Sequence, residues 1–171
     1  MAFINVATRK VFATPSTFST GGKWIEQKAR DFLEHVKTEG LACTILMRDL
    51  DKAFSERFNS VFTSRGIDVK PVGPRAPNLN AFIERWIQSL KQEVLDHFIV
   101  FGQSHFDYIV HEYIDHYHEE RPHQGIGDLL LASRGEPDNE DVDDEVTTLS
   151  MADIRCKTRL GGILKSYTRV A

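Results

Sequence analysis

The stretch "NAFIERWIQSLKQE", residues 80–93, predicts an amphipathic helix. We expect this helix to run from about Leu79 to Phe98, because apolar residues recur at three- and four-residue spacing. Seven residues of helix bring Lys91 within about 20° of Glu84, roughly 10 Å further along the axis. By itself such a pair most often belongs to a solvated flank. The predicted buried stripe beside it consists of Ile83, Trp86, Ile87, Leu90, Val94 and Phe98.

Strands and helices alternate in the part of the chain before this helix, which predicts a mixed α/β fold. Residues 3–13 predict two strands around a tight turn. Residues 22–40 predict an amphipathic helix that Gly40 ends. The apolar run "LACTILM" (41–47) has the pattern of a strand buried on both faces. The remaining predicted elements are a helix over 51–66, a strand over 67–72, a loop over 73–78 and a helix over 104–120 closed by Pro122.

Asp49 lies just beyond the predicted strand 41–47. Carboxylates at the carboxyl ends of strands in α/β sheets face the crevice where ligands and metals bind. The alternative is that Asp49 or Asp51 only caps the following helix. Because Asp51 is nearer to that helix, we expect Asp51 to be the cap and Asp49 to be free for a ligand.

Together these features resemble the catalytic core of the retroviral-integrase superfamily, specifically insertion-sequence transposases with an Asp-Asp-Glu triad. Asp49, with Phe54 five residues later, is similar to the second Asp and its aromatic neighbour, and 34 residues separate Asp49 from Glu84. "ATRKV" (7–11) resembles the Thr-Arg pair that opens the family's third strand, and "YIDHYHEERPHQGIG" (113–127) resembles its closing signature. The resemblance covers roughly residues 3–127, with a weaker echo in "RLGGILKSY". The family's Pro-loop, Asn-Ala, Glu and Lys-x-Glu pattern falls on Pro77, Asn80, Ala81, Glu84, Lys91 and Glu93.

The resemblance implies a ribonuclease-H-like mixed sheet flanked by helices. It also implies strand transfer by in-line displacement at phosphorus, with two Mg²⁺ (or Mn²⁺) ions activating the attacking and leaving oxygens. Hard cations need carboxylate oxygens. In the family the first Asp bridges both ions, and Asp49 and Glu84 match the two residues that each hold one.

Partners and supporting residues follow from the same resemblance. Lys91, together with Arg85 and Asn80, is expected to contact DNA at transposon ends or target. Arg121 and His123 are expected to support the end of the fold. The chain is expected to assemble as a homo-oligomer or with an intact transposase.

The chain departs from the family pattern at its beginning. Thr8 lies seven residues after Met1, whereas the family's first Asp lies about twenty residues before the Thr-Arg pair. We therefore expect the first strand and its Asp to be missing, since Asn5 is the nearest polar residue and has no charge. His118 also stands where relatives usually have Asn. The strand 41–47 then loses a neighbour, and we expect the chain alone to be inactive.

Two other functions remain open. One is a non-catalytic DNA-binding or regulatory partner of an intact transposase. The other is a free-standing ribonuclease-H-like nuclease, which would require a complete carboxylate set.

The charge distribution predicts three regions. The 171 residues have a net charge of −4, but residues 136–145 alone hold seven acids and no base. We expect a partial catalytic core over 1–130, an acidic disordered linker over 131–150 and a basic tail over 151–171. The tail is expected to be either a docked strand or a loose arm, and DNA is one candidate partner for it.

Other sequence features exclude several protein classes. No signal peptide or membrane span is recognisable, so we expect a cytoplasmic, nucleoid-associated protein with no membrane partner. The two cysteines, Cys43 and Cys156, form no CxxC pair. His111 and His118 share a helix face, but their spacing matches no zinc signature.

Overall fold

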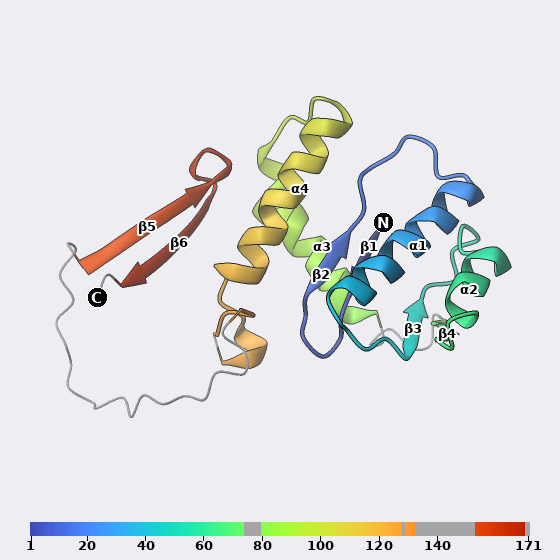
Figure 1. The fold of residues 1–171 in the computed structure, drawn as a ribbon. Helices are drawn as coiled ribbons and strands as arrows, with labels where there is room; N and C mark the ends of the chain where they lie inside the picture. The colour runs from blue at the N-terminus through green and yellow to red at the C-terminus, as the bar shows by residue number, and fades with distance from the viewer. Residues whose placement is uncertain (74–79, 128, 133–152, 170–171) are drawn as a thin grey trace. The chain divides into compact units, whose positions relative to one another are not determined.

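The computed structural model describes residues 1–73, 80–127, 129–132 and 153–169. It is a mixed α/β protein whose described strands form three two-stranded sheets (Figure 1). Its contacts define two compact units, Met1–Gln88 and Ser89–Ala171. Each unit is described by itself.

The first unit begins with the predicted pair of strands. β1 (Ala2–Ile4) and β2 (Val11–Ala13) pair antiparallel, with Phe3 opposite Phe12. Asn5 organises the turn between them, because its Oδ1 accepts hydrogen bonds from the backbone N–H groups of Ala7 and Thr8 at 2.9 and 3.0 Å. The two strands and their turn therefore confirm the prediction for residues 3–13.

A parallel strand pair follows, with a helix between its two strands. β3 (Ile45–Arg48) pairs with β4 (Asp68–Pro71), and α2 (Glu56–Thr63) connects them. β3 begins later than predicted, and Ile45 is 52% exposed, so the prediction of a strand buried on both faces is wrong. Among the described strands β3 has β4 as its one partner. Successive side chains of a strand point to opposite faces, and here only one face is covered by the helices.

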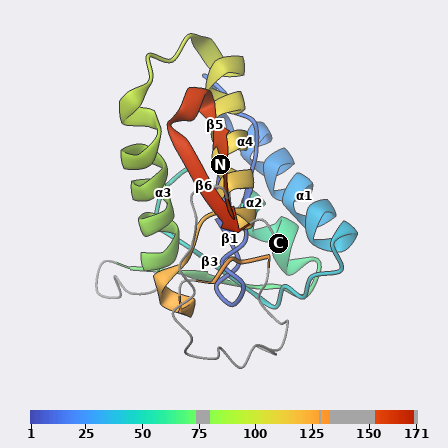
Figure 2. The same ribbon diagram turned by 90° about the vertical axis from the view of Figure 1, so that its left-hand side faces the viewer.

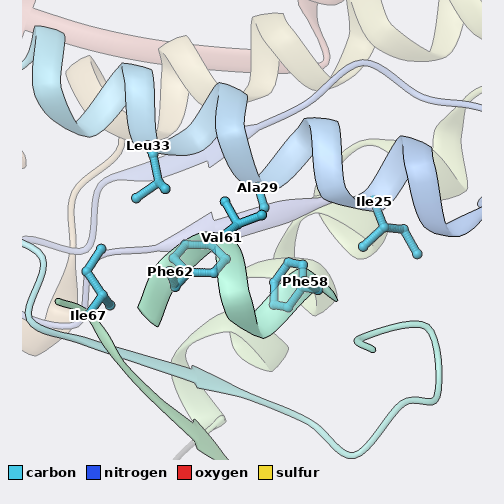
Figure 3. Close-up of a cluster of buried hydrophobic side chains, with 7 residues drawn as sticks. All are labelled: Ile25, Ala29, Leu33, Phe58, Val61, Phe62 and Ile67. Carbon is cyan, nitrogen blue, oxygen red and sulfur yellow. The ribbon is translucent and has the colours of Figure 1, made fainter. Parts of the chain in front are cut away.

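The core of the first unit lies between two helices. α1 (Gly22–Thr38) ends where Gly40 adopts a left-handed φ of 61°, as predicted for a helix over 22–40. Seven buried side chains from α1, α2 and the position just before β4 pack together (Figure 3). Ile25, near the start of α1, belongs to this core. The cluster consists of Ile25, Ala29, Leu33, Phe58, Val61, Phe62 and Ile67.

The helix predicted over residues 79–98 is shorter in the structure. α3 runs from Ala81 to Glu93, and a separate 3-10 turn, η2 (Leu95–His97), follows it. The α-helix stops because Val94 has φ −134° and ψ −65°, outside helical values. Trp86, Leu90 and Val94 are buried as predicted, but Ile87 is 51% exposed and is not part of the buried stripe.

The second unit contains the last predicted helix. α4 (Gly102–Glu119) confirms the helix expected over 104–120 and buries Ile109 and Tyr113. A short 3-10 turn, η3 (Gln124–Ile126), follows it. An isolated bridge joins His123 to Leu129.

The basic tail forms a hairpin. β5 (Ile154–Arg159) and β6 (Leu164–Arg169) run antiparallel, side by side in both views (Figures 1 and 2). They are joined by η5 (Leu160–Gly162), where Gly161 and Gly162 have φ values of 66° and 92° that favour glycine. The tail is therefore a docked pair of strands. The acidic run 136–145 lies outside the described residues, and the three predicted regions stay a prediction.

None of the described helices is both long and apolar enough to span a membrane.

Candidate functional site

Asp49 occupies the predicted place directly after β3 and is exposed. The carboxyl ends of two parallel strands meet here, because Arg48 lies opposite Pro71 in the register. Asp49 Oδ1 accepts a hydrogen bond from the backbone N–H of Asp51 at 3.1 Å. No other described residue forms a hydrogen bond or ion pair with this carboxylate. Its Oδ2 oxygen is therefore available to a ligand from solvent.

Asp51 does not cap the following helix, so that prediction is wrong. α2 begins at Glu56 with Ser55 as its N-cap residue. Asp51 Oδ1 instead accepts a hydrogen bond from the backbone N–H of Ala53 at 2.8 Å. The residues between β3 and α2 form tight polar turns, in which an Asp side chain bonds to the backbone two residues later. Asp49 and Asp51 both stabilise this connection.

Arg48 holds the end of β3 in place, a role that the sequence interpretation missed. Its Nε donates to Asn59 Oδ1 on α2 at 3.0 Å, and its Nη1 donates to the carbonyl of Asp49 at 2.7 Å. Its guanidinium also lies 5.8 Å from the ring centre of Phe54. The sequence feature that could have indicated this role is the position of Arg48 directly before the candidate ligand Asp49, at the end of a strand. Arg48 thus fixes the backbone that carries Asp49.

Glu84 lies in the first turn of α3 and is exposed. Its backbone N–H donates to the carbonyl of Asn80 at 3.0 Å, which places Asn80 at the start of the helix. The Glu84 carboxylate forms no hydrogen bond or ion pair with another described residue. Both of its oxygens are therefore available. The preceding Pro77 lies outside the described residues.

Arg9 contacts the same helix turn. Its guanidinium lies 3.4 Å from the ring centre of Phe82, in a cation–π arrangement. Arg9 adopts φ 65°, an unusual value for a residue with a side chain. Its Nη1 donates to the carbonyl of Val6. The turn after β1 therefore places Arg9 against α3. The residue that it contacts, Phe82, lies two positions before Glu84.

Asn5, the polar residue nearest to the expected first Asp, is uncharged and directly follows β1. Its side-chain oxygen is committed to two backbone N–H groups of the β1–β2 turn. The role of Asn5 is therefore to shape the turn that carries Arg9.

Asp49 and Glu84 both belong to the first unit. Among the described residues, no group of three or more His, Cys, Asp or Glu side chains is placed to hold a metal ion. Asp49 and Glu84 are only two residues and would not form such a group by themselves. Their joint binding of a metal ion therefore stays a prediction.

Two basic residues of α3 are exposed as a DNA-contact role requires. Lys91 lies in the last turn of the helix and Arg85 directly follows Glu84. Neither side chain pairs with an acid of the described chain. Because α3 is continuous over both positions, the seven-residue spacing keeps Lys91 on the same side of the helix as Glu84.

Arg121 is part of a structural clamp in the second unit. Its Nε and Nη2 donate to the two carboxylate oxygens of Glu93 at 3.1 and 2.8 Å. This bond raises the pKa of the guanidinium. Tyr113, fully buried on α4, donates its hydroxyl to Glu93 Oε2 at 3.4 Å. Burial, followed by the charge of Glu93, raises the pKa of Tyr113. The clamp joins the end of α3 to α4 and to the Arg-Pro-His segment.

His123 is buried behind this clamp. Its Nε2 lies 2.8 Å from the carbonyl oxygen of Tyr117, so this nitrogen must carry the proton. Its backbone N–H donates to the carbonyl of Leu129 at 3.1 Å. Burial lowers the pKa of His123 and favours the neutral ring. His123 fastens the end of α4 to the following segment.

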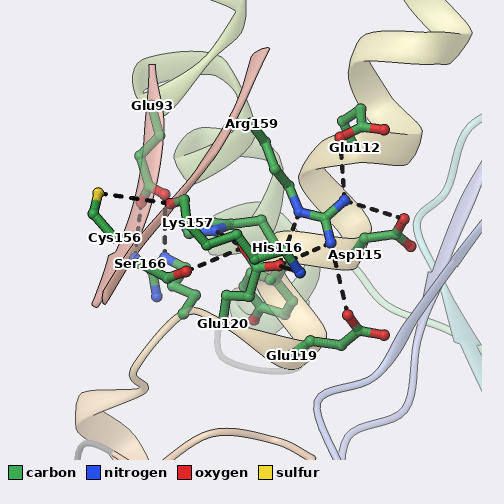
Figure 4. A network of polar contacts seen from close by, with 12 residues as sticks. Glu93, Glu112, Asp115, His116, Glu119, Glu120, Cys156, Lys157, Arg159 and Ser166 are labelled. Carbon is green, nitrogen blue, oxygen red and sulfur yellow. Dashed lines mark hydrogen bonds and ion pairs between the residues drawn. The ribbon is translucent and has the colours of Figure 1, made fainter. Parts of the chain in front are cut away.

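The second unit also contains an acidic cluster around Arg159, shown in Figure 4. Arg159 donates from Nη1 to Glu112 at 3.1 Å and from Nε and Nη2 to Glu120 at 2.9 and 2.8 Å. Its side chain is 14% exposed, and the hydrogen bonds that it donates to Glu120 raise its pKa. Asp115 and Glu119 lie 3.6 and 3.7 Å away. This cluster docks the hairpin onto α4.

Glu120 is the acid at the centre of the cluster, with 8% of its side chain exposed. Lys157 and Arg159 pair with it, and His116 Nδ1 lies 3.1 Å from its Oε2. Burial by itself raises the pKa of Glu120. The hydrogen bonds from Arg159, Lys157 and His116 together outweigh burial and lower that pKa to about 2.

The histidines of α4 take part in separate contacts. His111 Nδ1 lies 3.5 Å from Asp115 Oδ1, and His116 contacts Glu120. His118 lies at an intermediate depth on the same helix. These contacts are to carboxylates at (i, i+4) spacing, which is a common way to stabilise a helix.

Residues 65–129 match the family model described as an integrase core domain. The matched segment contains Glu84, Lys91, Arg121 and His123, whereas Asp49 and the β5–β6 hairpin lie outside it. No curated protein matches the chain.

Proposed function

We propose, from the match of residues 65–129 to the integrase core domain model, that this chain is part of a DNA transposase or integrase catalytic core. In this proposal the first unit belongs to a ribonuclease-H-like fold. Asp49 and Glu84 are two of the carboxylates that hold catalytic divalent ions, and α3 contacts DNA beside them.

The observation that carries the proposal is the state of the two carboxylates. Asp49 follows a parallel strand at its carboxyl end, and Glu84 lies in the first turn of α3. Both are exposed, and at least three of their four oxygens have no partner among the described residues. An ionised carboxylate can accept several bonds, so oxygens without a protein partner remain open to a ligand from solvent. Asp49 and Glu84 therefore fit the role of metal ligands better than the role of helix caps.

The donor set fits magnesium or manganese. These ions take oxygen ligands and keep water or substrate phosphate in their remaining positions. When bound, they would supply charge stabilisation for displacement at phosphorus. The protein side chains do the positioning: Arg48 holds the backbone of Asp49, and Arg9 packs on the turn of α3 that carries Glu84.

The basic residues of α3 are proposed to hold the DNA. Lys91 and Arg85 are exposed cations without an acidic partner in the described chain. Contacts to phosphate position a duplex without reading its sequence. Asn80, at the start of α3, is proposed to add a polar contact.

We expect this chain alone not to join DNA strands. The family reaction uses three carboxylates, and Asp49 and Glu84 match two of them. The chain therefore acts as a DNA-binding partner within an assembly, either with further copies or with an intact transposase.

Manganese binding tests the site directly. Paramagnetic Mn²⁺ is titrated into the ¹⁵N-labelled chain, and amide signals are expected to broaden first around residues 49–53 and 81–85. Asp49→Asn and Glu84→Gln should each reduce this broadening. Asp68→Asn is the matched control, because Asp68 is an exposed acid at the other end of the same strand pair. Equal broadening in all three variants would remove the metal site from the proposal.

Catalysis is tested with the full chain, Mn²⁺ and labelled duplex DNA carrying the flanking element ends. The expected result is bound but unjoined DNA. Strand transfer by this chain alone would overturn the expectation of inactivity. Absence of any DNA binding would overturn the proposed role as a DNA-binding partner.

A further inference from the structure

The β5–β6 hairpin has two chemically different faces, and its register assigns each residue to one of them. Directly opposed residues of an antiparallel pair point to the same face. One face carries Arg155, Lys157, Arg159, Leu164, Ser166 and Thr168, and the other carries Ile154, Cys156, Thr158, Lys165, Tyr167 and Arg169.

The first face is used for docking onto α4. Arg159 and Lys157 pair with Glu120, and Ser166 Oγ lies 3.5 Å from the same carboxylate (Figure 4). Leu164 and Ser166 are buried, at 4% and 8% exposure. The acids of α4 and the adjacent Glu120 therefore neutralise Lys157 and Arg159 on this face.

The second face points to solvent. Lys165, Tyr167 and Arg169 are exposed at alternate positions of β6, and Tyr167 is 65% exposed. Neither Lys165 nor Arg169 forms an ion pair with a described residue. A cation, an aromatic ring and a second cation thus follow one another along one strand.

The β5–β6 hairpin has a large excess of positive charge. Residues 154–169 contain five basic residues and no acid. Since Lys157 and Arg159 are already paired, the net positive charge that remains is carried by exposed side chains. Such an arrangement selects an anionic partner.

We propose that this second face, defined by Lys165, Tyr167 and Arg169, binds the phosphate backbone of duplex DNA. The inference rests on the proposed function, and it adds a DNA-contact surface separate from α3. The four residue steps from Lys165 to Arg169 span about 14 Å, the length of about four base-pair steps. Lys165 and Arg169 contact phosphates at the two ends of this span, and the Tyr167 hydroxyl donates to a phosphate between them.

The chemistry of the face favours DNA over a lipid surface. Membrane binding requires several large apolar side chains beside the basic residues. Here Ile154 is the one aliphatic residue on the face, and it is 36% exposed. A two-stranded ribbon is also narrow enough to follow a groove of the duplex.

Fluorescence anisotropy with a labelled duplex tests the inference on the full chain, in buffer with EDTA so that metal binding plays no part. The Lys165→Glu/Arg169→Glu variant is expected to lose affinity at least tenfold at low salt. The slope of log K against log salt should become shallower by about 2, because each phosphate-paired cation contributes about 0.9. Tyr167→Ala should weaken binding severalfold without changing this slope.

The matched control is Lys23→Glu/Lys37→Glu, which makes the same change in net charge at two exposed lysines of α1. It should keep the wild-type slope. Amide hydrogen exchange of β5 and β6 establishes that each hairpin variant remains docked. Equal losses in the control and the hairpin variant would overturn the inference, as would tighter binding to anionic vesicles than to DNA.

A third variant distinguishes this inference from the proposed function. Lys91→Glu/Arg85→Glu removes the two basic residues of α3. If this variant loses DNA affinity while the hairpin variant keeps it, the inference fails and the proposed function stands. If only the hairpin variant loses affinity and Mn²⁺ does not bind at Asp49 and Glu84, the inference stands and the proposed function fails.

Discussion

Arg159 donates two hydrogen bonds to one oxygen: its Nε and Nη2 lie 2.9 and 2.8 Å from Oε1 of Glu120. The two residues are 39 positions apart, on the β5–β6 hairpin and at the end of α4. Charged groups with such low exposure are costly unless they are paired and hydrogen-bonded. This contact therefore decides whether the basic tail is docked.

We expect Arg159→Leu to detach the hairpin from α4. The substitution leaves Glu120 with Lys157 and His116 but without the two hydrogen bonds from Arg159, which should lower the free energy of unfolding by about 2 kcal/mol. Hydrogen exchange of the β5 and β6 amides measures the effect. Arg155→Leu, on the exposed end of the same strand, is the control and should change little. Unchanged protection in Arg159→Leu would contradict this role.

Docking of the hairpin should depend on pH through Glu120. The pKa of this carboxyl is lowered to about 2 in the folded chain, from an ordinary value of 4.5. A carboxyl with a depressed folded pKa contributes stability above its unfolded pKa and loses it as pH falls through the folded value. We expect a loss on the order of 2 kcal/mol between about pH 4.5 and pH 2.

Urea unfolding monitored across this pH range measures the loss. Glu120→Gln removes the titrating group, so the variant should be less stable at neutral pH and show a flatter profile in this window. An identical pH profile in the variant and the wild type would assign the acid sensitivity to other carboxylates.

Arg121→Lys tests whether the clamp on Glu93 depends on geometry or only on charge. The guanidinium reaches both carboxylate oxygens at once, and an ammonium group cannot reproduce this fork. Because both side chains are about 30% exposed (29% and 32%), we expect a moderate loss of about 1–2 kcal/mol. Urea unfolding of Arg121→Lys and Arg121→Ala gives the comparison. If Arg121→Lys is as stable as the wild type, charge alone maintains the clamp.

Arg9 and Phe82 should be coupled energetically. Their cation–π contact joins the β1–β2 turn to α3 at a partly exposed site, so a coupling energy of about 0.5–1 kcal/mol is expected. A double-mutant cycle with Arg9→Ala and Phe82→Ala measures it from denaturant unfolding. Additive effects would mean that Arg9 acts only through its turn. The same variants report on the candidate site, because Mn²⁺ broadening near Glu84 should weaken if the turn of α3 shifts.

Local patterns in the sequence predicted most of the secondary structure. The periodic apolar residues of α1, α3 and α4 and the glycine at the end of α1 placed these helices correctly, with errors of a few residues at their ends. Such features are local because helix periodicity and caps depend on residues within a few positions of each other. The closing residues Arg121 and His123 were also expected to support the fold, and both have structural contacts.

The errors arose where distant residues decide the outcome. Ile45 and Ile87 are apolar, yet the tertiary structure leaves both about half exposed, because no described element covers them. Asp51 had the right type and place for a cap, but the helix begins later, at Glu56. Sequence spacing cannot reveal which neighbour covers a face or where a turn ends.

The sequence by itself determined the order and type of the elements, the integrase resemblance and the identity of the candidate ligands Asp49 and Glu84. These depend on residue chemistry and on spacing along one element. The tertiary structure alone decided that the basic tail is a docked hairpin, with Arg159 held by Glu120 and with Lys165 and Arg169 left exposed. The physical reason is that ion pairing acts between side chains brought together from distant positions, and no local pattern of charge specifies its partner.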